Sequence, residues 1–235
     1  MTNSWHETLG VFDLETTGVD VETCRIVTAH VGVINAAGGV INAAGEPLEA
    51  QSWLADPGVE IPEGASAVHG ITTEYAQANG RPAAEVVAEV VDALRDLLGR
   101  GIPVTIYNAP YDLTLLNREA LRHGITPLQT PRPIIDPLVI DKFVDRYRKG
   151  KRTLTAAAER YGVDLTSAHD AAADAVAAGR VAQALLAKYP DQLAIELGTL
   201  HDLQTTWAAE QSASFQEYMR RSNPSFTTST LWPER

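Results

Sequence analysis

The 235-residue chain has one cysteine, few aromatic residues and no long apolar run. A single cysteine, Cys24, excludes an internal disulfide and a zinc site built on several thiolates, and it fits a reducing compartment. No apolar run approaches the length of a membrane span, and the opening "MTNSWHETLG" lacks the basic and apolar regions of a signal peptide. Because 45% of the residues are hydrophobic, we expect a cytoplasmic globular protein with a sizeable core and no membrane partner.

Positive charge is also scarce. The chain has 19 Lys and Arg residues against 30 Asp and Glu residues, a net charge of -11. This balance argues against broad, non-specific binding to nucleic acid. The exception is "KFVDRYRKGKR", residues 142–152, where six basic residues accompany one acid. Such a cluster is either a solvated surface or a local contact for a polyanion.

The hydrophobic pattern predicts strands first and then strands that alternate with helices. Strands are expected at 9–15, 25–35, 40–43, 50–56, 102–108 and 133–136. Residues 57–64 carry Pro and Gly and are expected to form a loop. Helices are expected at 82–99, 109–124, 154–162, 169–189 and within 191–220, before an irregular tail at 222–235. This order predicts an α/β fold with a mixed sheet flanked by helices.

Two acids interrupt an apolar strand in "VFDLETTG", residues 11–18. Asp13 and Glu15 are two positions apart, so on a strand they project to the same face. Two neighbouring carboxylates repel unless a cation joins them, and hard oxygen ligands suit magnesium or manganese. The same spacing at Asp20–Glu22 lies in a polar turn, where solvation explains it. The first pair differs because it ends a buried strand, where α/β sheets place their sites.

Two further motifs carry acids at helix starts. In "YNAPYDLTLL", Asn108 precedes Asp112 by four residues, and Asp112 is expected in the first turn of a helix. In "AHDAAADA", His169 precedes Asp174 by five. The simpler interpretations are a carboxylate that stabilises a helix dipole and polar residues on an exposed, alanine-rich helix start.

Taken in order, these motifs resemble those of the DnaQ-like 3'→5' exonucleases of the DEDDh group. "FDLETTG" matches the first motif, "HGIT" an intermediate one, "YNAPYDLTLL" the second and "AHDAAADA" the third. "IIDPLVIDK" resembles the segment after the second motif in proofreading members, which act in DNA replication and repair. The resemblance covers roughly residues 8–188. It implies a ribonuclease-H-like fold, a five-stranded mixed sheet with an antiparallel second strand and helices on both faces.

The resemblance also implies roles for individual residues. Four acids would hold two Mg²⁺ or Mn²⁺ ions: Asp13, Glu15, Asp112 and Asp174. His169 would be the general base, because imidazole can accept a proton near neutral pH. Four residues would contact the substrate: Thr16, Thr17, His69 and Asn108. Tyr111 departs from the family pattern, which usually has Phe at that position.

The resemblance implies two-metal hydrolysis of phosphodiesters at a nucleic acid 3'-end. The motifs favour DNA, and an exoribonuclease that trims short RNA or tRNA ends is the alternative. A non-catalytic, polymerase-associated module is a further alternative, although such a module would be expected to lack at least one of the five catalytic residues.

The expected domain organisation is an exonuclease domain at 1–189 and a helical extension with an irregular tail at 190–235. A DNA polymerase is one expected partner. "QLAIEL", residues 192–197, loosely follows the peptide pattern that binds bacterial sliding clamps, and an amphipathic segment that covers its own core is the simpler interpretation.

Overall fold

The computed structural model describes residues 5–36, 49–165 and 167–235. Six strands form one mixed sheet in the order β4-β3-β2-β1-β5-β6. Their bounds are Thr8–Thr16 (β1), Ile26–Asn35 (β2), Ala50–Asp56 (β3), Arg81–Pro82 (β4), Val104–Thr105 (β5) and Ile134–Ile135 (β6). β2 is antiparallel to both of its neighbours, β1 and β3, whereas β5 and β6 continue parallel to β1. The predicted α/β class and the antiparallel second strand are confirmed.

The sheet has one strand more than the five that we expected, because the two residues of β4 pair in parallel with the end of β3. The strands expected at 102–108 and 133–136 shorten to two residues each. The first leaves the sheet because the chain turns at Asn108, whose φ of 67° lies in the left-handed region. The strand expected at 40–43 lies outside the described residues.

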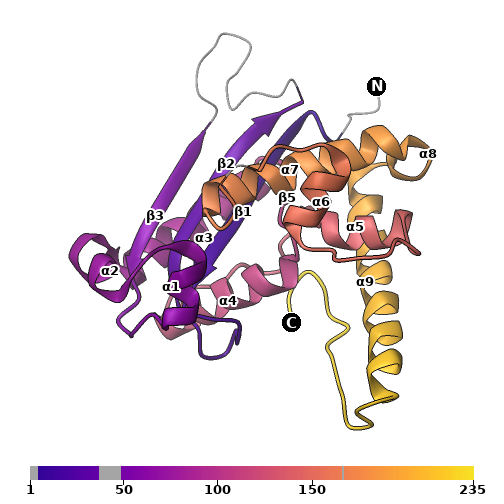
Figure 1. Ribbon diagram of the computed structural model, residues 1–235. Coiled ribbons are helices and arrows are strands. Elements are labelled where there is room, and N and C mark those ends of the chain that lie inside the picture. The colour runs from indigo at the N-terminus through magenta and orange to yellow at the C-terminus, as the bar shows by residue number, and fades with distance from the viewer. Residues whose placement is uncertain (1–4, 37–48, 166) are drawn as a thin grey trace.

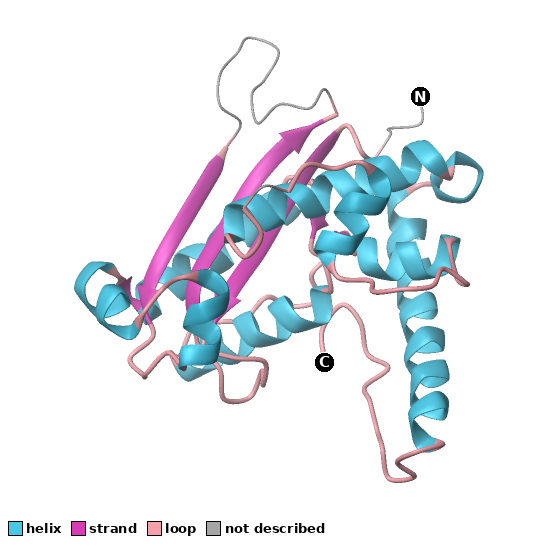
Figure 2. Cartoon of the chain, viewed as in Figure 1, coloured by secondary structure: helices cyan, strands magenta, loops and turns pink. Residues whose placement is uncertain are grey.

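Nine helices are described in these ranges, and they cover both faces of the sheet (Figures 1 and 2). Their bounds are Glu63–His69 (α1), Thr73–Asn79 (α2), Ala83–Gly99 (α3), Ala109–Arg122 (α4), Pro137–Val144 (α5), Leu154–Tyr161 (α6), Ala171–Lys188 (α7), Pro190–Leu193 (α8) and Leu197–Arg220 (α9). The sequence did not predict α1, α2 or α5. Helix α1 buries no residue, so it carries no apolar stripe, and it begins inside the loop expected at 57–64. No helix in the described part of the chain is long and apolar enough to cross a membrane.

Helices α7 and α3 lie on opposite faces of β1. A Cβ on Gly179 of α7 would lie 2.7 Å from Val11, whereas one on Gly10 would lie 3.0 Å from Leu97 of α3. Residues 10 and 11 point to opposite faces of a strand, so the two helices do as well. Val11, Asp13 and Glu15 share the face that α7 covers. Gly179 therefore allows a close approach that brings the start of α7 toward these two acids.

The C-terminal helix α9 covers the open edge of the sheet. The amide of Ile134 in β6 donates to Nδ1 of His201 at 3.1 Å, and its carbonyl accepts from Nε2 of Gln204 at 3.0 Å. These side chains satisfy backbone groups that an edge strand leaves unpaired. After α9 the tail turns back toward α4, where the amide of Arg235 donates to the Thr114 hydroxyl at 2.9 Å (Figure 1). The tail is irregular, as predicted, yet Trp232 within it is buried.

Candidate active site

The first motif ends β1 as the sequence predicts. Phe12 and Leu14 are buried in the core, whereas Asp13 and Glu15 are only partly buried and lie on the other face of the strand. The backbone between Glu15 and Thr16 breaks the regular register with β2. The two carboxylates therefore lie near the C-terminal end of β1, before the turn that follows it.

The second motif is a sharp entry into α4. Asn108 is the residue before the helix, and its left-handed backbone turns the chain out of β5. Asp136 fixes this turn, because its carboxylate accepts hydrogen bonds from the amides of Asn108 and Ala109, each at 3.0 Å. Asp112 lies in the first turn of α4 and is 3% exposed. A carboxylate so deeply buried at a helix start is stabilised in part by the helix dipole.

The third motif opens α7. Asp170 caps the helix by accepting the Ala173 amide at 3.0 Å, and one oxygen of Asp174 accepts the His169 amide at 3.1 Å. His169 has a φ of 70°, so it is a second predicted site residue in the left-handed region that L-residues rarely adopt. Such conformations cluster at functional sites.

Side chains from two of these motifs converge. Ligand atoms of Glu15, His169 and Asp174 all lie within 4.8 Å of one another. The second oxygen of Asp174 is buried and has no hydrogen-bond partner. Asp13 and Asp112 belong to the same electrostatic cluster, since the carboxylate of Asp112 raises the pKa of Asp13 and that of Glu15 raises the pKa of both.

Crowding changes the acidity of the whole cluster. Burial raises the pKa of Asp13 well above its ordinary value, and the carboxylates of Asp112 and Asp174 raise it further. Burial, followed by repulsion from Asp174 and Asp170, raises the pKa of Glu15 from 4.5 to about 7. Burial likewise raises the pKa of Asp112 and of Asp174. Each carboxylate thus resists its charged form while its neighbours are charged.

The cluster has the composition of a divalent-cation site. It offers carboxylate oxygens and one imidazole, a donor set that suits hard ions such as Mg²⁺ and Mn²⁺. A bound cation would relieve the repulsion that raises these pKa values, and it would supply a partner for the buried Asp174 oxygen. The residues therefore fit the metal ions that the family resemblance implies.

Two of the four residues expected to contact substrate, Thr16 and Thr17, support the turn after β1. The hydroxyls of Thr16 and Tyr111 lie 2.6 Å apart, and both reach the Gly18 carbonyl, at 2.7 and 2.5 Å. The Thr17 hydroxyl accepts the Arg25 amide at 3.0 Å. These hydrogen bonds hold the turn that follows β1.

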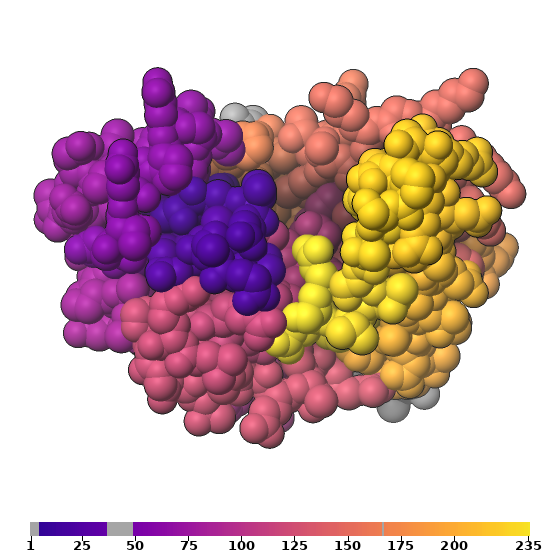
Figure 3. Space-filling view, turned by 90° about the horizontal axis from the view of Figure 1, so that it is seen from below, coloured from indigo at the N-terminus to yellow at the C-terminus, as the bar shows by residue number. Residues whose placement is uncertain are grey.

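His69 reaches the site from α1. Burial lowers the pKa of its imidazole, the Thr16 backbone opposes this shift, and His169 adds to it. Nδ1 of His69 accepts the Ile71 amide at 3.2 Å, whereas Nε2 is buried without a hydrogen-bond partner. His69 thus lies between the first and third motifs, beside the end of β1. Figure 3 shows a hollow on this face, between the segment that follows β1 and the C-terminal segment.

Three site residues were missed by sequence reasoning, namely Tyr111, Asp136 and Asp170. Tyr111 was noted only as a departure from a pattern, although its hydroxyl ties α4 to the turn after β1. Asp136 stands before Pro137 as the N-cap of α5, a signal that the sequence contains. Its contacts with Asn108 and Ala109, 28 and 27 residues away, leave no local signal.

The basic cluster at 142–152 is partly structural. Arg148 and Arg152 both bind the buried carboxylate of Asp141, at 2.5 and 2.8 Å. They neutralise an internal charge and are not free to contact a polyanion. The surface cations of the cluster are therefore fewer than the sequence suggests.

The segment that loosely follows the clamp-binding pattern, residues 192–197, begins in α8 and ends at the first residue of α9. Leu193 is fully buried, and its carbonyl accepts the Trp5 indole N–H at 2.9 Å. These contacts favour the simpler interpretation, that residues 192–197 cover the protein's own core.

The sheet topology and the carboxylate cluster at the end of β1 are those expected of a DnaQ-like nuclease of the DEDDh type. The exonuclease family model RNase_T matches residues 11–182, and the chain belongs to this family. The predicted family is therefore confirmed, and the model that matches is that of an exonuclease. Among curated proteins, no sequence matches the chain significantly.

Solved structures of exonuclease I share the fold. One exonuclease I structure gives a TM-score of 0.66 at 19% identity, over 89% of this chain and 46% of the other. Escherichia coli exonuclease I in complex with a dT13 oligonucleotide gives 0.63 at 19% identity, over 79% and 42%. Exonuclease I from Methylocaldum szegediense gives 0.62 at 20% identity, over 79% and 42%. The chain thus spans less than half the length of these proteins.

Proposed function

We propose that this protein removes nucleotides from DNA 3'-ends by metal-dependent hydrolysis. The observation that carries the proposal is the convergence of Glu15, His169 and Asp174 from β1 and α7, with Asp13 and Asp112 in the same cluster of raised pKa values. The activity is assigned to residues 1–189, which contain all of these side chains. The extension at 190–235 is assigned a supporting role.

The five catalytic residues take two roles in the proposal, metal ligand and general base. Asp13, Glu15, Asp112 and Asp174 would hold one or two Mg²⁺ or Mn²⁺ ions. When bound, such ions neutralise the carboxylates and stabilise negative charge on the phosphate under attack. His169 would accept the proton of the attacking water, since it is exposed and within reach of the acids.

The surrounding residues would position the terminal nucleotide. Thr16 and Thr17 form a rigid turn, because their hydroxyls are bound within it, and this turn can present backbone amides to the substrate. His69, whose buried Nε2 has no hydrogen-bond partner, would contact the terminal nucleotide from α1. Asn108 would contact the substrate from the start of α4.

DNA is favoured over RNA by the motifs "DLETTG" and "HGIT". The similar exonuclease I from E. coli was solved with single-stranded dT13 and dA16 oligonucleotides, which supports the same substrate class here. A single 3'-end fits either nucleic acid, so the test must compare the two.

The test is a degradation assay on 5'-labelled DNA and RNA of matched sequence, as single strands, duplexes and mismatched duplexes, with Mg²⁺, Mn²⁺ or a chelator. We expect ladders that shorten from the 3'-end of DNA only when metal is present. Asp13→Asn is the inactive control, and Asp20→Asn is its matched control in the second, solvated Asp-x-Glu pair. If RNA is degraded faster than DNA, RNA is the substrate. If degradation proceeds without metal, the proposed metal site is wrong.

A further inference from the structure

A groove runs between α9 and the segment that follows α5. It encloses about 630 Å³, and its walls come from residues 142–152 on one side and from 207–218 of α9 on the other. Three of its residues, Lys142, Gln211 and Phe215, also line a second groove of about 260 Å³. The two grooves are therefore adjacent. The proposed hydrolysis leaves this feature without a role.

The larger groove carries aromatic rings that are exposed. Tyr147 is 88% exposed, Tyr218 is 63% exposed and Phe215 is 50% exposed. Below them, Phe143 stacks on Trp207 with ring centres 3.8 Å apart and an interplanar angle of 8°. Exposed rings of this size are costly in water, and two walls that carry them mark a binding surface.

Each exposed tyrosine is accompanied by an arginine. The guanidinium of Arg146 lies 6.0 Å from the centre of the Tyr147 ring, and that of Arg221 lies 5.9 Å from the Tyr218 ring. Lys142 adds a third cation, at the junction of the two grooves. Stacking surfaces with interleaved cations are what single-stranded nucleic acid requires, because bases stack on rings while phosphates attract the cations.

The smaller groove extends from these shared residues to the start of α4. Its lining includes Asn108, which opens α4 four residues before Asp112, and Asp136, which fixes that turn. A strand whose 3'-end lies at the carboxylates could therefore continue past Asn108 and Lys142 to the exposed tyrosines.

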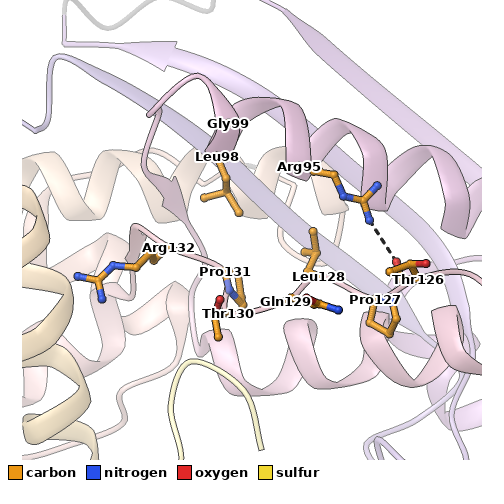
Figure 4. Close-up of a pocket in the computed structure, with 10 residues that line it drawn as sticks. All are labelled: Arg95, Leu98, Gly99, Thr126, Pro127, Leu128, Gln129, Thr130, Pro131 and Arg132. Carbon is orange, nitrogen blue, oxygen red and sulfur yellow. Dashed lines mark hydrogen bonds between the residues drawn. The ribbon is translucent and has the colours of Figure 1, made fainter.

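Another cavity, of about 420 Å³ between α3 and residues 126–132, lacks these features (Figure 4). None of the ten residues that line it is aromatic. Its arginines are occupied, since Arg95 binds Asp92 and the Thr126 carbonyl, and Arg132 binds Asp202 at 3.0 Å. This cavity therefore lacks the combination of exposed rings and available cations that the groove beside α9 has.

We propose that the groove between residues 142–152 and α9 holds the single-stranded nucleic acid that lies upstream of the 3'-end being hydrolysed. The proposal rests on the proposed function, because it takes the 3'-end to lie at the carboxylates. It gives the C-terminal extension a direct role in substrate binding and predicts that longer strands bind more tightly than short ones.

The test measures binding by fluorescence anisotropy of labelled oligothymidylates of about 4 and about 16 nucleotides, a range that spans known single-strand site sizes. The parent protein is Asp13→Asn with Mg²⁺, so that the probes stay intact. The test variant adds Tyr147→Ala and Tyr218→Ala, and the matched control adds Tyr75→Ala, an exposed ring on α2 that is 52% exposed. A third variant keeps the rings with Tyr147→Phe and Tyr218→Phe.

In the parent, the long probe should bind at least about fivefold more tightly than the short one. This factor corresponds to about 1 kcal/mol, the lower end of what one stacked base contributes to binding. The double alanine variant should lose this ratio, whereas the phenylalanine variant and the Tyr75 control should keep it. Arg146→Ala should reduce the salt dependence of long-probe binding by about 0.7 in logarithmic slope, the contribution of one phosphate contact to a single strand.

The proposed role of the groove is wrong if the Asp13→Asn parent binds both probes with equal affinity. It is also wrong if the double alanine variant keeps the ratio of long-probe to short-probe affinity. Failure of the proposed function has a different signature. In that case the wild-type protein hydrolyses no DNA or RNA end with Mg²⁺ or Mn²⁺, whatever the length ratio.

Discussion

Removing one charge from the carboxylate cluster should make the metal-free protein more stable. Glu15→Gln keeps the size of the side chain and deletes the charge. Burial and the carboxylates of Asp174 and Asp170 raise the pKa of Glu15 to about 7 in the folded protein. Between its ordinary value of 4.5 and about 7, the folded state binds more protons than the unfolded state. Stability therefore falls as pH rises through this window.

The size of the effect follows from the same pKa. A rise from 4.5 to about 7 corresponds to about 3 kcal/mol of lost stability once the group is fully ionised. Glu15 is partly exposed, and solvent screens its repulsion, so we expect about 1–2 kcal/mol. For a chain of this length, each kcal/mol moves the melting temperature by about 2–4 °C.

The assay is thermal unfolding of wild type and Glu15→Gln in chelator, at about pH 5 and about pH 8. We expect the variant to melt higher by about 2–8 °C at the upper pH, and by much less at the lower pH. Glu22→Gln is the matched control, because Glu22 belongs to the solvated Asp20–Glu22 pair and contacts Arg118 at 3.1 Å. It should bring no gain at either pH.

Bound metal should reverse the order of the two melting temperatures, so that wild type melts higher than Glu15→Gln. A cation at ten times its Kd adds about 1.4 kcal/mol to wild type, and less to a variant that has lost a ligand. A Glu15→Gln protein that melts at the wild-type temperature in chelator at both pH values would refute the repulsion on which the metal site is argued. A gain that Mg²⁺ leaves unchanged would refute the metal site alone.

Four further changes test other parts of the site. Asp13→Asn should abolish 3'-end degradation at every Mg²⁺ concentration while the fold, followed by circular dichroism, survives. His169→Ala should lower turnover by about 10²–10⁴, the usual contribution of a positioned base, with metal binding retained in calorimetry. Tyr111→Phe should lower the free energy of unfolding by about 1 kcal/mol, measured with urea, because the turn after β1 loses its bonds to that hydroxyl. Gly179→Ala should cost about 1–3 kcal/mol in the same assay and weaken metal binding, because the new methyl group would lie 2.4 Å from Ile34 and displace α7 with Asp174.

The parts of the fold that depend on local patterns were predictable from sequence. Strand β1 and helices α3, α4 and α7 carry clear apolar periodicities, and their observed bounds agree with the expected ones to within three residues. The motifs lie at the ends of these elements, so their order along the chain predicted which acids would be neighbours. Asp13 and Glu15 share a face because side chains alternate along a strand, whatever the rest of the chain does.

The parts that depend on distant contacts were not predictable. Residues 134 and 135 form a strand only two residues long, and α9 supplies His201 and Gln204 to complete the hydrogen bonds of Ile134. The carboxylate of Asp136 joins the starts of α4 and α5 and the indole of Trp232, which lies 96 residues away. No local pattern in "IIDP" encodes these partners, because a side chain's burial partners are fixed by the tertiary fold.

The acidic composition and the binding of a polyanion are compatible because charge acts over short distances. At physiological salt, charges more than about 8 Å apart are largely screened, so a net charge of -11 does not govern binding at one groove. What matters is the local set of free cations. Arg148 and Arg152 neutralise the buried Asp141, which leaves Lys142, Arg146 and Arg221 around the exposed rings. At the carboxylates, the same argument requires bound metal ions, because without them the cluster would repel a phosphate. Binding of the 3'-end at the carboxylates would therefore depend on metal concentration. Binding of the upstream strand in the groove would depend on ionic strength.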